Sequence, residues 1–124
     1  MKIFAIFMSL MSLSAWSGSS MKFEGSCIGT LKNKVPIAFT YYSNFDGCKN
    51  TSSAAIAYTA GIKGLCTGTR SFKNNQDIYS FTKNTLSFPD STGNTSGTLK
   101  YFDGRATQTI KVQCEVRDYE YGDC

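Results

Sequence analysis

The sequence predicts an all-β fold: a small antiparallel meander of about eight strands, closed as a barrel or packed as a sandwich and stapled by disulfides. Two observations predict it. Short runs of alternating apolar and polar residues recur along the 124-residue chain, and turn residues separate them at the spacing typical of barrels and sandwiches. Five cysteines supply the staples. A helix suits only 54–60, where Ile56, Tyr58 and Thr59 favour a strand instead.

The predicted strands are joined by links of hairpin length. Pro36 stands near the start of the second strand, where a missing N–H is tolerated. Asp103-Gly104, between the last two strands, is the strongest hairpin signal of the sequence. Because short links join neighbouring strands, we expect the chain to wind up and down and to protect its edges by pairing the first strand with the last. The predicted strands are 23–31, 35–43, 53–60, 65–72, 77–82, 85–88, 98–102 and 106–116.

Residues 1–17 are expected to be a secretory signal peptide, which leaves 18–124 as a single β domain. Lys2 gives the leader a positive start, a mostly apolar run follows, and Ala15 and Ser17 are the small residues that a signal peptidase reads. The apolar run is shorter than the ~20 residues of a spanning helix, so no membrane span is expected after cleavage. We therefore expect a secreted or periplasmic protein.

In an exported chain of this size, the five cysteines indicate disulfides rather than metal ligands. A meander that closes on itself brings the first and last strands together, which favours a Cys27–Cys114 bond. It also brings the loop after the second strand and the C-terminal tail to one end, which favours Cys48–Cys124. Cys66 is then free. A local Cys114–Cys124 bond is the main alternative.

The composition excludes several classes of function. The chain has no His, which rules out Ser-His-Asp and Cys-His catalysis and His-ligated zinc. It has no C-x-x-C spacing, and we expect neither a metal nor a cofactor. Thirteen Lys and Arg against nine Asp and Glu give a formal charge of +4, and the basic residues are scattered, so specific nucleic-acid binding is not expected.

Aromatic residues near one end of the predicted barrel are the candidate ligand-binding set. Tyr is amphipathic and has few rotatable bonds, which suits sugar faces and protein surfaces. The partner is unidentified, and a glycan or a protein fits this chemistry. The alternative is that about half of these rings fill the end of the barrel, because the chain has few aliphatic residues. The candidate residues are Tyr41, Tyr42, Phe45, Tyr119 and Tyr121.

The sequence therefore favours an exported, non-enzymatic module that binds a small ligand, a glycan or a protein, with no catalytic residues assigned. Two other functions stay open. One is a small cell-envelope hydrolase that pairs Asp46 with Glu120 or Asp123, since glycoside hydrolysis uses two facing acids. The other is a purely structural or inhibitory disulfide module without a pocket.

Overall fold

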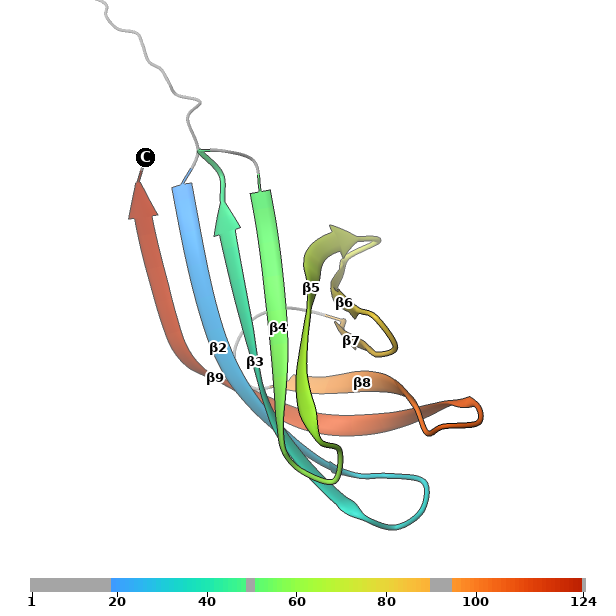
Figure 1. Cartoon of the computed structure of the whole chain (residues 1–124). Helices are drawn as coiled ribbons and strands as arrows, with labels where there is room; N and C mark the ends of the chain where they lie inside the picture. The colour runs from blue at the N-terminus through green and yellow to red at the C-terminus, as the bar shows by residue number, and fades with distance from the viewer. Residues whose placement is uncertain (1–18, 49–50, 90–94, 124) are drawn as a thin grey trace, which may run out of the picture.

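The computed structural model describes residues 19–48, 51–89 and 95–123 (Figure 1). In this part of the chain, eight antiparallel strands form a closed barrel in which each strand pairs with its neighbour in sequence and the last pairs with the first. The predicted all-β meander is therefore confirmed, as a barrel. Its strands are β2 (Ser19–Thr30), β3 (Pro36–Asp46), β4 (Thr51–Ala60), β5 (Gly64–Lys73), β6 (Gln76–Phe81), β7 (Thr85–Phe88), β8 (Thr95–Phe102) and β9 (Thr107–Asp123).

Several strands run further than the alternation of the sequence predicts. β9 continues to Asp123, so most of the segment expected as a charged tail is strand. β2 begins at Ser19, and β3 continues to Asp46 into the expected loop. The strand ends extend because they pair with one another: Ser20 of β2 pairs with Asp46 of β3 on one side and with Gly122 of β9 on the other. Each strand end supplies hydrogen-bond partners to the next.

The ends of four strands form an extension beyond the closed part of the barrel. The pairing of β4 with β5 ends at Ala54 and Gly68, and the pairing of β8 with β9 ends at Thr95 and Cys114. Beyond these points β9, β2, β3 and β4 continue as a curved four-stranded sheet (Figure 1). We call this sheet, built from 19–24, 42–46, 51–53 and 115–123, the extension.

The interior is filled by alternate residues of the strands, with β5 contributing only partly buried side chains such as Cys66. The Tyr41 ring lies over Gly25 on the neighbouring strand, where an added Cβ would collide with it. No helix among the described residues has the length and hydrophobicity needed to cross a membrane. The buried apolar residues are Cys27, Leu31, Ile37, Phe39, Tyr41, Ala54, Ile56, Tyr79, Leu86, Phe88, Leu99, Tyr101, Ile110, Val112 and Cys114.

A disulfide joins the first and last strands of the barrel. Cys27 and Cys114 lie opposite each other on β2 and β9 and are bonded, 87 residues apart in sequence, as predicted. Cys66 is free, also as predicted. The local Cys114–Cys124 alternative is excluded, because Cys114 is bonded to Cys27. Cys48 is disulfide-bonded. Its expected partner Cys124, like the expected leader 1–17, lies outside the described residues.

Candidate functional site

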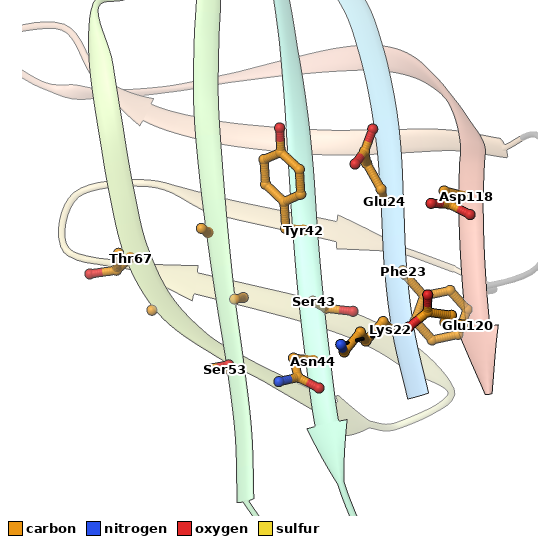
Figure 2. A pocket seen from close by; sticks show the side chains of 13 residues that line it. Lys22, Phe23, Glu24, Tyr42, Ser43, Asn44, Ser53, Thr67, Asp118 and Glu120 are labelled. Atoms are coloured by element: carbon orange, nitrogen blue, oxygen red, sulfur yellow. Dashed lines mark ion pairs between the residues drawn. The ribbon is translucent and has the colours of Figure 1, made fainter. Parts of the chain in front are cut away.

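The outer face of the barrel carries a groove of about 560 Å³, which we call the outer groove (Figure 2). It crosses five strands, from β5 through β4, β3 and β2 to β9, where the extension leaves the closed barrel. Its lining residues are Lys22, Phe23, Glu24, Tyr42, Ser43, Asn44, Ser53, Ala54, Ala55, Thr67, Gly68, Asp118 and Glu120.

Small residues make the floor of the groove low. The outward positions of β4 are Ser53 and Ala55, and β5 contributes Thr67 and Gly68. None of these side chains reaches far from the sheet, so the longer side chains of β3 and β2 stand above them. The depth of the groove therefore arises from a difference in side-chain size between neighbouring strands.

Tyr42 is the aromatic side chain on the outer surface of this groove. It is 40% exposed, whereas its neighbours Tyr41 and Ser43 are each 4% exposed, because successive residues of a strand point to opposite faces. In register, Tyr42 lies between Glu24 of β2 and Ala55 of β4. The Thr40 hydroxyl and the Tyr42 hydroxyl are hydrogen-bonded at 3.2 Å, with Thr40 as donor. This contact holds the ring along β3.

Carboxylates line one wall of the groove. Glu24 lies opposite Asp118 in register, and their side chains stand beside each other in Figure 2. Lys22 Nζ lies 3.6 Å from Glu120, and Arg117 lies 3.4 Å from Glu24. Three carboxylates thus meet two cationic groups, so this wall is acidic on a chain whose formal charge is +4.

The structure divides four of the five aromatic residues that the sequence places together between the two faces of the sheet. Tyr42 lines the outer groove, whereas Tyr41 is in the core, where its ring packs against Tyr79 and Phe88 at centroid distances of 5.1 and 5.4 Å. This matches the alternative interpretation for part of the set. Burial, with a smaller contribution from the Asp77 charge, raises the pKa of Tyr41 to about 12.

The other three candidates also lie away from the groove or outside the described side chains. Phe45 is half-buried. It lies on β3 with Tyr41, and because side chains of a strand alternate between its two faces, both point to the inward face. Tyr121 is 60% exposed on the inner face of the extension, because its neighbour Glu120 lines the outer groove. For Tyr119 the structure describes the backbone pairing with Phe23 but not the side chain.

The acid pairs considered for hydrolysis are not brought together across the groove. Asp46 accepts a hydrogen bond from the Cys48 N–H at 3.0 Å, as a turn-forming residue does, and it does not line the groove. The groove carboxylates come from β2 and β9 alone, so they share one wall. Within the described residues, no group of three or more His, Cys, Asp or Glu is placed to hold a metal ion.

Arg70 and Asp77 form a buried ion pair in the interior beneath the extension, which the sequence analysis does not predict. Arg70 donates to both carboxylate oxygens of Asp77, at 2.7 and 2.9 Å, and the two side chains are 14% and 3% exposed. The guanidinium lies 4.6 Å from the centre of the Phe23 ring. Burial is the largest influence and lowers the pKa of Arg70, but hydrogen bonding to Asp77 and the charge interactions with Tyr79, Asp77 and Tyr41 together outweigh it and raise that pKa above the usual value.

Ser43 and Tyr79 complete this buried polar cluster. The Tyr79 hydroxyl donates to Ser43 Oγ at 3.4 Å, and Arg70 reaches the same oxygen at 3.5 Å. The polar side chains of this cluster thus have partners, which is the condition for burying them. We assign the cluster a structural role, as a polar plug between the core and the extension.

Comparison with family models, with curated proteins and with solved structures gives no match for this chain.

Proposed function

We propose that this protein is an exported, non-enzymatic binding module that holds a short glycan in the outer groove. The observation that carries the proposal is Tyr42, a 40%-exposed ring standing over a floor of small side chains and beside Glu24. A flat aromatic face suits the apolar face of a sugar ring, and neighbouring carboxylates accept hydrogen bonds from its hydroxyls.

The size and polarity of the groove support a small ligand rather than a flat protein partner. Its volume of about 560 Å³ lies within the ~300–1,000 Å³ usual for ligand pockets. The polar groups are few and come from separate strands: Glu24 from β2, Asn44 from β3 and Ser53 from β4. Such spaced donors and acceptors suit the hydroxyls that project around a sugar ring.

Two observations support the remaining parts of the proposal. The Cys27–Cys114 disulfide is compatible with an oxidising compartment, as export through the expected leader requires. The acids of the groove share one wall, whereas canonical glycoside cleavage uses two acids that flank the bond. Binding without cleavage is therefore the function that this geometry supports best.

The test is an array of neutral, acidic and amino-sugar oligosaccharides, probed with the wild-type protein, Tyr42→Ala and Tyr121→Ala. We expect Tyr42→Ala to weaken binding about tenfold or more, as loss of an aromatic contact does. Tyr121→Ala is the matched control, because it removes an exposed ring from the opposite face of the same sheet. Tyr42→Phe keeps the stacking face and should bind within a few-fold of wild type.

Two results would overturn the proposal. One is that the folded wild-type protein binds no member of the array. The other is that Tyr42→Ala and Tyr121→Ala bind equally well. Because Tyr42 lies outside the core, circular dichroism should show that both variants keep the wild-type fold.

A further inference from the structure

The last part of β9 pairs on one side only among the described residues. β8 accompanies β9 as far as Thr95 and Cys114, whereas β2 accompanies it to Ser19 and Asp123. In Figure 1, β9 is correspondingly the outermost strand of the extension. We call Asp118–Asp123 the β9 edge. A strand edge of this kind presents backbone N–H and C=O groups to which another strand can pair.

The register identifies which backbone groups face the open side. In an antiparallel pair, opposite residues whose Cα atoms approach closely do not hydrogen-bond to each other. The Cα atoms of Cys27 and Cys114 are 4.1 Å apart, so these two residues form such a non-hydrogen-bonded pair. Alternation along β2 then directs the N–H and C=O of Lys22 and Ser20 toward β9, to Glu120 and Gly122. The Ser20 hydroxyl bonds the Gly122 carbonyl at 3.4 Å, consistent with this direction.

It follows that Tyr119, Tyr121 and Asp123 direct their N–H and C=O groups to the side away from β2. These three residues alternate with the ones that hold β9 to the sheet. The β9 edge is therefore a row of main-chain donors and acceptors on a strand that is already paired with β2, which is the arrangement used when a peptide adds to a sheet.

The charges of the β9 edge select the partner. Asp118 and Glu120 both project on the outer face, where they line the groove. A second copy of this chain could pair antiparallel with the β9 edge about a two-fold axis that passes between Asp118 and Glu120 or through one of them. An acidic side chain of one copy would then face an acidic side chain of the other, which destabilises a sheet. The contact of Glu120 with Lys22 is no obstacle to a new partner, since both side chains are largely exposed and such pairs contribute only ~0–1 kcal/mol.

We propose that the β9 edge binds an extended basic segment of a partner protein, which adds as a further strand with Lys or Arg opposite Asp118 and Glu120. This inference does not require the glycan proposal, because it depends on main-chain groups at the sheet edge and on the charges of Asp118 and Glu120, which also form part of one wall of the outer groove. It assigns the protein a second, protein-binding surface.

The experiment uses two synthetic peptides of about eight residues, one alternating Thr with Lys and one alternating Thr with Glu, titrated into the full protein and followed by NMR and calorimetry. We expect saturable binding of the Lys peptide and slower amide-proton exchange at Tyr121 and Asp123. The Glu peptide should not bind. An Asp118→Lys, Glu120→Lys double variant should reverse this preference.

A backbone substitution separates strand addition from simple charge attraction. Tyr121→Pro removes an N–H on the open side and leaves the pairing with β2 in place, a setting in which a strand accepts proline. We expect it to weaken binding of the Lys peptide about tenfold or more, while Tyr121→Ala, which keeps the N–H, binds within a few-fold of wild type. Circular dichroism checks that both variants fold.

Three results would overturn the inference. They are no binding of either peptide, unchanged binding by a folded Tyr121→Pro variant, and protection of amides elsewhere than the β9 edge. If Tyr121→Pro fails to fold, the charge-reversed double variant decides, because a β9 site requires its preference to switch to the Glu peptide.

Discussion

Among single residues, Arg70 and Asp77 illustrate how this small barrel tolerates charge inside. Their bidentate contact at 2.7 and 2.9 Å is almost fully buried, and Ser43 and the Phe23 ring occupy the remaining sides of the guanidinium. A buried ion pair contributes little net stability compared with a well-packed apolar pair, but removing one partner leaves an uncompensated charge.

For this reason we expect Asp77→Ala to lower the free energy of unfolding by about 3–5 kcal/mol. An Arg70→Met, Asp77→Leu double variant should recover most of that loss, because neither charge is then buried. Urea unfolding followed by circular dichroism measures both values. Equal destabilisation by the single and double variants would contradict the assignment of Arg70 and Asp77 as a structural pair.

Tyr41 and Tyr42 show which feature of the site the sequence could not predict. Tyr41 and Tyr42 are adjacent and chemically identical, yet one fills the core and the other lines the groove. The period of two in a strand requires that they separate, but it does not say which of them faces inward. That choice depends on the register with β2, where Gly25 provides the space for the Tyr41 ring. The register is likewise what places Glu24 beside Tyr42.

At the scale of elements, the contact of β2 with β9 closes the barrel. The Cys27–Cys114 disulfide ties these strands at the point where the closed barrel gives way to the extension. A cross-link that spans 87 residues restricts the unfolded chain strongly, and in the chain-entropy account its stabilisation grows with the length of the loop.

We therefore expect a Cys27→Ala, Cys114→Ala double variant to be less stable than wild type by about 2–5 kcal/mol. Cys66→Ala is the control, since Cys66 carries no disulfide; it should cost ~1 kcal/mol or less. Thermal and urea unfolding give both comparisons. A double variant as stable as the control would show that closure of the barrel does not depend on this bond.

The strands themselves could be predicted, because the alternation of apolar and polar residues and the turn residues between the runs depend on local sequence alone. The order of the strands followed from a further premise, that short links join neighbouring strands. The Cys27–Cys114 pairing needed a second one, that the first strand pairs with the last. The extension was not accessible in the same way. Its strand ends carry Ser, Asn, Asp and Glu, which read as loop and tail in isolation and become strand through pairing with one another.

At the scale of the whole molecule, tyrosines provide much of the interior. Burial raises the pKa of Tyr41 to about 12 and raises the pKa values of Tyr58 and Tyr79 further. The Tyr58 hydroxyl is buried with no hydrogen-bond partner in the described part of the chain. An unfolded tyrosine ionises near pH 10, so these residues hold their protons in the folded barrel at a pH where the unfolded chain loses them.

The sign of the resulting pH dependence follows from linkage. A folded-state pKa above the unfolded value contributes stability that is complete below about pH 10 and is lost as pH rises toward 12 and above. We expect stability to fall steeply over this range. In absorbance titrations at about 295 nm, Tyr41, Tyr58 and Tyr79 should ionise only as the barrel unfolds. Smooth ionisation of all tyrosines in a barrel that stays folded would contradict this picture of the core.

The central claim is that the outer groove is the ligand-binding surface of the barrel. The most direct measurement is an NMR titration of the isotope-labelled protein with the oligosaccharide that binds most tightly on the array. We expect the shift changes to centre on Glu24, Tyr42 and Ser53 and to leave the Tyr121 side chain unaffected. Changes confined to the inner face of the extension, or to the barrel end opposite the groove, would contradict the claim.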